Sequence, residues 1–380
     1  GTGAVFWMWV TALLGSATAF VEGTLAQIYK KRAKDGSCYG GPAYYIEQAL
    51  KQRWLGVLFA VVMILTYMVG FNLVASFNIA DSLKAYSFYD PTLTPWIVGI
   101  VLAVVFLVCI SGGGKQIANI TAVLVPVMGV LYLAVTLFVV FTHISLIPAV
   151  FASIFRNAFN FQAIFGGFVG SALMQGIKRG LFSNEAGIGA AACAAGSAGV
   201  SHPAKQGLVQ VLSVFIDTIV VCTATAMLLL CSGVEPTAEL EGAPYVQAAL
   251  SATFGPIGPI FITVAMVLFA FTTLIGNLYY VDNCLAYIVK KVPAKEFMIL
   301  FRIDAMILIF IGAGMQISTV WNLADVLMGI MAILNLPVIV ILARPALSAL
   351  KDYTTQKKQG KNPVFKAASI GLKEKTDYWN

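Results

Sequence analysis

The chain has 380 residues, of which 59% are hydrophobic and 11% are charged, and its mean hydropathy is +0.86. Soluble domains carry about 25% charged residues, so this composition excludes a soluble globular protein and indicates an integral membrane protein with many spans. The net charge of +7 does not indicate a nucleic-acid partner, because the basic residues gather in alternate loops between the apolar stretches.

Nine transmembrane spans are expected, since each needs about 20 apolar residues. The predicted spans are 5–29, 54–83, 95–111, 118–142, 160–177, 206–231, 258–288, 296–314 and 320–343. When the loops are numbered alternately, only Lys84 and Arg156 fall on the side opposite the other basic residues. By the positive-inside rule the basic side is cytoplasmic. The sequence therefore predicts a transmembrane domain over 1–350 and a cytoplasmic polar tail over 351–380.

The first half of the chain carries isolated polar residues inside apolar stretches. Glu22 lies late in the first span, and Asn72 and Ser76 share one face of the second. Asn72 is a candidate substrate contact, and an interhelical hydrogen bond is the alternative. Residues 33–50 predict a loop and a short amphipathic helix on the cytoplasmic face, and 144–159 an extracellular interfacial helix.

The fifth predicted span is interrupted by glycine. It contains Gly166, Gly167, Gly170 and Gly176 together with the amide of Gln175. Each glycine weakens a helix by about 1 kcal/mol relative to alanine, and lipid tolerates loosened backbone only where it is buried in protein or lines a wet cavity. Because broken spans of this kind bind substrates in secondary transporters, Gly166, Gly167, Gly170 and Gln175 are candidate substrate-binding residues. A close-packed seam of small residues is the alternative.

The segment after this span predicts a short helix. Ser183 is placed to cap its N-terminus, with Glu185 in the first turn, where the helix dipole favours an acid. The helix is either structural or part of a cytoplasmic gate. Further along, the proline-bounded segment 232–258 predicts an extracellular lid.

The seventh predicted span carries Thr272, Thr273 and Asn277. Two adjacent hydroxyl groups inside a span offer oxygen ligands to a hard cation such as Na⁺. The alternative is that both hydroxyls bond to carbonyls of their own helix. Asn277 is four residues beyond Thr273, so we expect it on the same face, toward the substrate cavity.

The two halves of the chain are expected to form an inverted repeat, as in many transporters. The first repeat covers 1–142 and the second 160–343, with Glu22 and Asp217 in matching spans. The helix that would pair with the broken span is then expected to precede the first residue, which makes the first repeat incomplete. The two acids either are structural groups bound to polar neighbours or carry coupling protons.

Metal and disulfide chemistry is not predicted. The six cysteines show no CxxC spacing, and His143 and His202 are isolated in the sequence, so no cofactor other than a coupling ion is expected.

Three motifs resemble those of the alanine or glycine:cation symporters, which are similar to the LeuT-fold superfamily. They are residues 3–15, which begin GAVFWMW, residues 180–187 (GLFSNEAG), and residues 361–365 (KNPVF). The resemblance implies an all-α integral membrane protein with a LeuT-like inverted repeat and discontinuous helices.

It also implies a symporter of the cell (plasma) membrane that couples Na⁺ or H⁺ entry to uptake of alanine, glycine, serine or glutamine by alternating access. By the family layout, Thr272 and Thr273 match the hydroxyl pair of the sodium site. Gly166, Gly167 and Gln175 fall in the broken sixth core helix. Asn277 stands where many members carry tryptophan, which predicts a larger and more polar pocket that suits glutamine.

Two other classes of function are the alternatives. An ion channel needs rings of charged or carbonyl groups along a continuous pore, and no repeated filter sequence is present. An intramembrane enzyme needs a nucleophile with a base or clustered histidines and carboxylates, whereas both histidines are predicted in loops. The sequence therefore favours a transporter and not an enzyme.

Overall fold

The computed structural model describes residues 1–33, 36–111, 114–159, 171–237, 240–291, 294–372 and 376–379. In chain order the elements are α1 (Ala4–Ile28), β1 (Lys31–Arg32), β2 (Cys38–Tyr39), α2 (Pro42–Leu50), α3 (Arg53–Ile64), η1 (Leu65–Phe71), α4 (Asn72–Asp81), α5 (Thr94–Ser111), α6 (Gly114–Thr142), η2 (Ile144–Leu146), α7 (Ile147–Ala158), α9 (Ala172–Asn184), α10 (Ala190–Ser197), α11 (Pro203–Val214), η4 (Phe215–Cys222), α12 (Thr223–Cys231), α13 (Ala243–Phe254), α14 (Ile257–Val289), α15 (Lys295–Ala313), α16 (Ile317–Ile341), α17 (Ala343–Lys358) and η5 (Ala367–Ile370).

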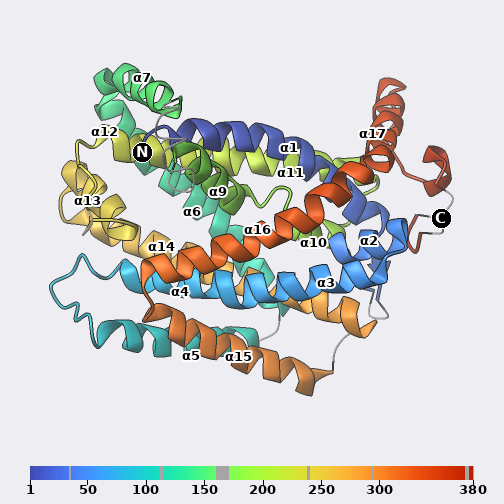
Figure 1. Ribbon diagram of the computed structural model, residues 1–380, viewed down its shortest axis with the longest axis horizontal. Helices are drawn as coiled ribbons and strands as arrows, with labels where there is room; N and C mark the ends of the chain where they lie inside the picture. The colour runs from blue at the N-terminus through green and yellow to red at the C-terminus, as the bar shows by residue number, and fades with distance from the viewer. Residues whose placement is uncertain are drawn as a thin grey trace.

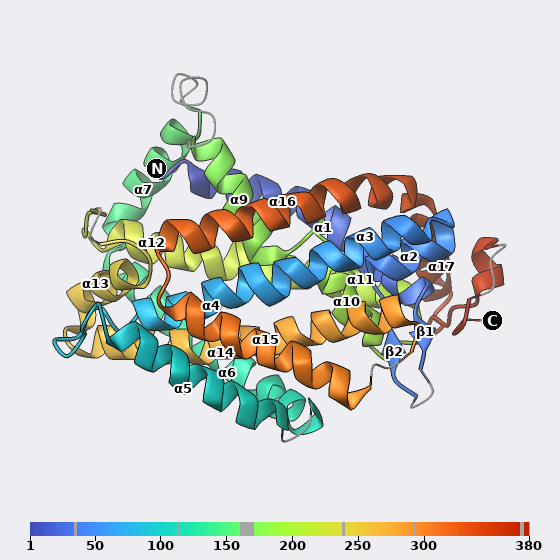
Figure 2. The same cartoon turned by 60° about the horizontal axis from the view of Figure 1, so that its bottom comes forward.

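The longest helices run together along the long axis of the molecule (Figure 1). The N-terminus, α7 and α13 lie at one end of this bundle, and α2, α17 and the C-terminus lie at the other (Figure 1). The small hairpin of β1 and β2 is at the same end as α2 and α17 (Figure 2). This end, which also carries Lys30–Arg32 and Lys290, is called the basic end below.

Six helical stretches in the described part of the chain are long and apolar enough to cross a membrane. They are Ala4–Ile28, Arg53–Asp81, Ala122–Thr142, Pro203–Cys231, Ile257–Val289 and Ile317–Ile341. Each coincides with a predicted span. A helix satisfies its own backbone hydrogen bonds, which is why continuous apolar sequence in lipid adopts it. The prediction of an all-α, multi-pass membrane protein is thus confirmed.

The other three predicted spans match a shorter helix, a helix with charged residues and a stretch that is described only in part. The span 95–111 is the short apolar helix α5, and 296–314 is α15, which carries charged residues. For 160–177, all but the last seven residues lie outside the described part of the chain. The described helix α9 begins at Ala172 and continues to Asn184, well beyond the predicted end of this span. The count of nine full spans is therefore not reached by the described residues.

Two long helices contain a π-helical turn midway. The stretch Arg53–Asp81 is π-helical at Leu65–Phe71, directly before Asn72, and Pro203–Cys231 is π-helical at Phe215–Cys222, which contains Asp217. A π-turn adds a residue to the helical turn and frequently marks a functional site. Sequence periodicity did not predict either turn, because the apolar pattern runs through both without a break.

Helix α1 packs closely against α9 and α11 (Figure 1). A Cβ atom at Gly176 would lie 2.5 Å from the Ala4 carbonyl oxygen, and one at Gly180 would lie 2.9 Å from the Thr11 Cβ. Glycines four residues apart thus let the two helices approach, which is the seam of small residues proposed as the alternative for this span. For Gly176, the structure supports that alternative.

The segment 232–258, predicted as a lid, contains α13. Its buried Gln247 amide donates to the Ser82 carbonyl at 2.7 Å and to the Thr263 hydroxyl at 2.9 Å. These bonds fasten α13 to the end of α4 and to α14. The predicted interfacial helix over 144–159 is the short helix pair η2 and α7.

The polar tail folds back onto the basic end of the bundle. The Phe365 backbone N–H donates to the Ser201 carbonyl at 3.0 Å, and the Ser201 hydroxyl donates to the Pro363 carbonyl at 2.9 Å. Near the C-terminus, the buried indole of Trp379 donates to the Gln27 carbonyl at 2.6 Å. The tail is thus a packed part of the structure, which its polar composition did not predict.

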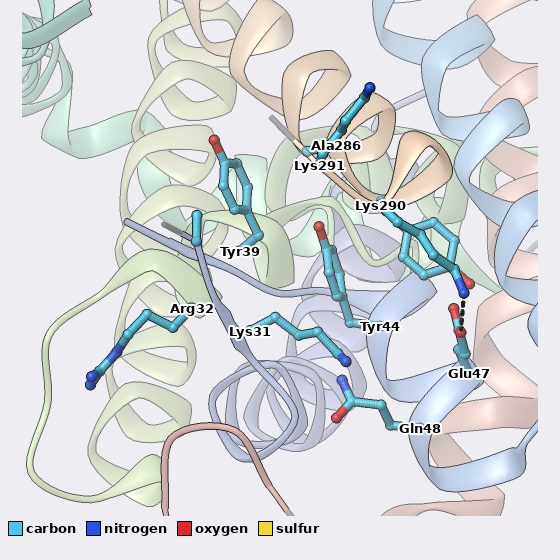
Figure 3. Close-up of a pocket in the computed structure, with 11 residues that line it drawn as sticks. Lys31, Arg32, Tyr39, Tyr44, Glu47, Gln48, Ala286, Lys290 and Lys291 are labelled. Carbon is cyan, nitrogen blue, oxygen red and sulfur yellow. Dashed lines mark ion pairs between the residues drawn. The ribbon is translucent and has the colours of Figure 1, made fainter. Parts of the chain in front are cut away.

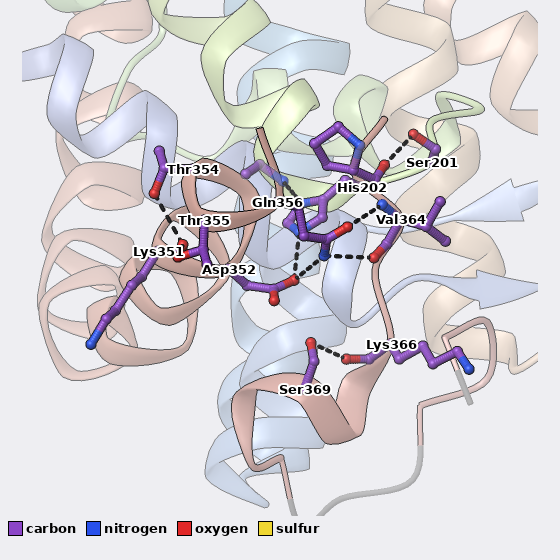
Figure 4. Close-up of polar contacts among 12 residues, drawn as sticks. Ser201, His202, Lys351, Asp352, Thr354, Thr355, Gln356, Val364, Lys366 and Ser369 are labelled. Atoms are coloured by element: carbon purple, nitrogen blue, oxygen red, sulfur yellow. Dashed lines mark hydrogen bonds and ion pairs between the residues drawn. The ribbon is translucent and has the colours of Figure 1, made fainter. Parts of the chain in front are cut away.

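His202 connects this tail to the bundle (Figure 4). Its ring is fully buried, its Nδ1 accepts the Ala204 N–H at 3.1 Å and so caps α11, and its Nε2 lies 3.1 Å from the Asp352 carboxylate on α17. Phe365 of the tail packs edge-on against the ring at 5.0 Å. Because Nδ1 is an acceptor here, the imidazole is neutral, with its proton on Nε2.

This geometry predicts that docking of the tail weakens in acid. Burial lowers the pKa of His202 below its usual 6.5, although Asp352 opposes the shift. When the tail undocks, His202 regains its usual pKa and binds a proton as pH falls below 6.5. The equilibrium constant for docking therefore falls by up to about tenfold per pH unit. Hydrogen exchange at the Phe365 amide, corrected for intrinsic rates, should show falling protection between pH 7.5 and 5.5. His202→Asn should abolish this change and His143→Asn should not; equal pH dependence in wild type and His202→Asn would contradict it.

Candidate functional site

The Glu22 carboxylate lies at the centre of a buried hydrogen-bond network and is 1% exposed. One oxygen accepts the Gly187 N–H at 3.1 Å, and the other accepts the side-chain amide of Asn335. The same amide donates to the Gly187 carbonyl at 3.1 Å, and Asn335 Oδ1 accepts the Tyr45 hydroxyl at 2.6 Å. The network, called here the Glu22 network, joins α1, α2, α16 and the loop that follows α9.

That loop has a backbone which glycine makes possible. Residues Glu185, Gly187 and Gly189 have φ of 54°, 89° and 92°. A Cβ atom at Gly187 would lie 2.8 Å from Leu336, and one at Gly189 would lie 2.4 Å from Pro42. Glycine is therefore required at both positions by conformation and by space. The loop turns the chain so that both backbone groups of Gly187 face Glu22 and Asn335.

The helix predicted to begin at Ser183 is wrong. Ser183 lies in the last turn of α9, Glu185 is the left-handed residue that ends α9, and α10 begins only at Ala190. An N-cap signal is local, and here a tertiary contact takes its place: the Ser183 hydroxyl donates to the Asp217 carboxylate.

Asp217 forms the second polar cluster. In addition to Ser183, the Thr218 hydroxyl donates to its carboxylate at 3.4 Å. Asn184 Nδ2 donates to the Thr218 hydroxyl at 3.0 Å, and Cys222 Sγ lies 3.1 Å from the Ser183 hydroxyl. Both acids thus have hydrogen-bond partners, as expected for ionisable groups inside spans.

The two acids hold opposite ends of one short segment, residues 183–187. Asp217 binds it at Ser183 and Glu22 binds it at Gly187. Glu22 lies six residues before the end of α1, or about 9 Å along a helix axis, so the segment lies in the half of the bundle toward the basic end. Glu22 and Asp217 therefore clamp this segment from two helices that pack together.

The environments of the two acids differ. Asp217 lines a cavity of about 310 Å³. Its polar lining includes Ser183, Asn184, Glu185, Gln210, Ser213 and Asp217. A cavity with this many polar partners is suited to hold water. Glu22 is enclosed by protein, whereas Asp217 has a route to water, so a proton reaches Asp217 more readily.

Asn72 and Asn277 are paired with each other. Asn277 Nδ2 donates to Asn72 Oδ1 at 2.8 Å between α14 and α4, and both residues are buried. This is the interhelical hydrogen bond named as the alternative for Asn72. Thr273 is exposed while Asn277 is buried, so the two side chains have different surroundings although they are four residues apart on α14. An α-helical step of four residues still differs by about 40°, enough to separate them here.

Thr272 and Thr273 lie near the middle of the 33-residue helix α14. Both hydroxyls donate to the Phe269 carbonyl, at 2.8 and 2.9 Å. The alternative of bonding to their own helix is therefore observed. A hydroxyl that donates its proton keeps its oxygen lone pairs, so the same geometry leaves both oxygens able to accept a cation.

The glycines expected to bind substrate, Gly166, Gly167 and Gly170, lie outside the described residues. Gln175 is half-buried on α9. Helix α9 begins directly after Ser171, whose backbone is extended (ψ 157°) and whose hydroxyl accepts the Met174 N–H. A helix thus begins inside the predicted span, at Ala172.

Two groups that connect α16 to the rest of the site were not predicted from the sequence. Asn335 was a detectable signal, as an amide inside an apolar span. The second group is Asp325, which pairs with Arg179 and lies 3.4 Å from Lys178 Nζ, while the Arg179 guanidinium lies 4.3 Å from the ring centre of Trp321. No local spacing indicated that these charges meet, because α9 and α16 are far apart in sequence.

Loss of the Glu22 network should destabilise the fold. Asn335→Ala removes the amide that Glu22, Gly187 and Tyr45 share, and leaves a buried carboxylate short of a donor. We expect a loss of about 2–3 kcal/mol in unfolding free energy and a clear fall in melting temperature in detergent. Asn322→Ala, an exposed site on the same helix, is the matched control. Equal stability of the two variants would contradict the assigned role.

Comparison with known proteins identifies the family. The family model described as the sodium:alanine symporter family matches residues 1–367. A probable sodium/glutamine symporter, GlnT, of Bacillus subtilis is 45% identical over 96% of this chain and 75% of its own length. The amino-acid carrier protein AlsT of the same organism is 45% identical over 98% of this chain and 78% of its own. The putative sodium/proton-dependent alanine carrier protein YrbD, also of Bacillus subtilis, is 41% identical over the whole of this chain and 80% of its own length.

These matches agree with the architecture described above. The family match covers the long apolar helices, both acids and the segment between them, and it reaches the first part of the docked tail. The chain therefore belongs to the sodium:alanine symporter family, a family of membrane transporters and not of enzymes.

Proposed function

We propose that this protein is a secondary active symporter that couples entry of Na⁺ or H⁺ to uptake of a small neutral amino acid by alternating access. The observation that carries the proposal is the family match over residues 1–367. The names of the relatives supply the substrate class, alanine or glutamine, and the coupling ions, sodium or protons. Glycine and serine belong to the same class by size and charge.

The energetics of one coupling ion are sufficient. Moving one charge across 100 mV yields about 2.3 kcal/mol, and a tenfold sodium gradient adds about 1.4 kcal/mol. Together these support roughly 500-fold accumulation of a neutral substrate. One Na⁺ for each amino acid is thus enough for uptake against a steep gradient.

Alternating access is proposed to rest on two inverted repeats, 1–142 and 160–343. The start of α9 at Ala172, inside the predicted span 160–177, supports the discontinuous helix that such repeats place at a substrate site. The charge asymmetry of the loops supports placing the basic end and the tail in the cytoplasm of a cell-membrane protein. Segment 183–187, which lies toward that end, is then the element best placed to gate release.

The substrate site is proposed at the predicted span 160–177, with Gly166, Gly167, Gly170 and Gln175 as contacts. The pair Asn72 and Asn277 uses one donor and one acceptor of two amides, and each amide has two donors and two lone pairs in total. Remaining capacity would suit a polar side chain such as that of glutamine.

Two kinds of coupling group are proposed. Thr272 and Thr273 are the candidate Na⁺ ligands, because their oxygens remain able to accept near the middle of α14. Asp217 is the better candidate for a proton carrier, because it lines the polar cavity, whereas the enclosed Glu22 acts as a structural acid.

Uptake by liposomes tests the proposal. The natural full-length protein that contains residues 1–380 should accumulate labelled alanine or glutamine when a sodium or proton gradient is imposed, and should show counterflow without one. Unlabelled alanine, glycine, serine and glutamine should compete. Gradient-independent, non-saturable flux would instead indicate a channel.

The hydroxyl pair gives a sharper prediction. Thr272→Ala and Thr273→Ala each remove one oxygen ligand, so half-maximal uptake should require about tenfold more Na⁺, with amino-acid preference unchanged. Thr→Ser at either position keeps the oxygen and should keep the wild-type sodium dependence. Wild-type sodium dependence in both alanine variants would contradict the prediction. It would mean that the two hydroxyls only bond to the Phe269 carbonyl.

A further inference from the structure

A basic cavity of about 660 Å³ opens at the end of α14 (Figure 3). Its walls come from three places: the hairpin of β1 and β2, helix α2, and the last turn of α14. Four cationic side chains line it, namely Lys31, Arg32, Lys290 and Lys291. Among the described residues that line the cavity, Glu47 supplies the one carboxylate.

The charges around this cavity are incompletely compensated. Glu47 lies 3.4 Å from Arg53 and 3.9 Å from Lys290, so two cations share it. Lys31 lies 3.7 Å from Asp377, and both side chains are nearly half exposed. Charge-assisted bonds of full strength are about 2.7–2.9 Å long, so these contacts are weak. The cavity therefore retains a positive excess that an anion would neutralise.

Arg53 already lies at the C-terminal end of α14, where the helix dipole is negative. The Arg53 guanidinium donates to the Ile288 carbonyl at 3.4 Å, and Lys290 ends the helix in the left-handed conformation. The ammonium groups of Lys290 and Lys291 are thus not needed to cap α14. In Figure 3, Lys290 reaches toward Glu47 on one side of Tyr44, and Lys31 reaches toward Gln48 on the other.

The surroundings of the cavity have the character of a membrane interface. Trp54, at the start of α3 and directly after Arg53, is 65% exposed, and tryptophan is enriched where a span meets the headgroups. Val289, beside Lys290, and Phe297, on the next helix, are also exposed. An anion in the cavity would therefore lie next to surfaces that accept acyl chains. A soluble anion gains nothing from these surfaces.

We infer that this cavity binds the phosphate of an anionic phospholipid headgroup, with Lys31, Lys290 and Lys291 as its cationic contacts. The tyrosine walls accept the glycerol portion, and the acyl chains leave along the exposed apolar residues. Such a lipid would connect α2 with α14 and so hold the basic end together. The site is separate from the candidate substrate and cation residues.

Direct lipid binding tests this site without a transport assay. The probes are detergent micelles doped with phosphatidylglycerol or phosphatidylcholine, and the readouts are bound lipid by native mass spectrometry and the shift in melting temperature. Wild type should bind phosphatidylglycerol in preference to phosphatidylcholine. Lys290→Gln with Lys291→Gln should weaken that binding by about fivefold per lysine, or about 25-fold for the pair. Lys290→Arg with Lys291→Arg keeps the charge and should retain binding.

The matched control is Lys357→Gln with Lys358→Gln, which removes two charges from the exposed last turn of α17, at the same end of the molecule. Its binding should stay within about twofold of wild type. An equal loss in the control would show a general surface potential and overturn the site. Equal binding of the two lipids would also overturn it. Displacement of phosphatidylglycerol by millimolar inorganic phosphate or glycerol 3-phosphate would assign the cavity to a free phosphate and overturn the lipid assignment.

Discussion

The buried carboxylate of Glu22 is the constraint on which the basic half of the bundle depends. A charged or polar group inside a membrane protein is costly unless protein partners replace water. Glu22 finds them in a backbone N–H and in Asn335, and Asn335 then fixes Tyr45. One acid thereby sets the relative positions of α1, α2, α16 and the loop after α9.

The same requirement shapes the rest of the interior. Hydroxyls in the spans donate to their own helices, as Thr272 and Thr273 do, and the two buried amides Asn72 and Asn277 pair across helices. Where helices must approach more closely, glycine supplies the space, as at Gly176 and Gly180. These polar groups have hydrogen-bond partners in the present conformation. If the bundle alternates between two conformations, some of those partners must change. Segment 183–187 is held in this way by an acid at each end, Asp217 at Ser183 and Glu22 at Gly187.

The basic end combines three kinds of contact, each with its own dependence on conditions. The Glu22 network is buried, so salt should screen it little. The contact of His202 with Asp352 responds to pH, because protonation of Nδ1 removes the cap of α11. The lysines at the cavity beside α14 are partly exposed, so their interactions are screened by salt. All three kinds of contact stabilise the same end of the transporter, where segment 183–187 is proposed to gate release of substrate.

The sequence by itself determined the fold class, the positions of six long apolar helices and the family, because span length, loop charge and short motifs are local properties of the chain. It also singled out Glu22, Asp217, Asn72 and Asn277, since a polar residue in an apolar run is visible without a structure. Only the tertiary structure decided their partners. Asn335 meets Glu22 across 313 residues and Asn277 meets Asn72 across 205, and Ser183 binds Asp217 where its local sequence favoured a helix cap. Hydrogen bonds between distant helices depend on packing, and packing is not encoded in any single stretch of sequence.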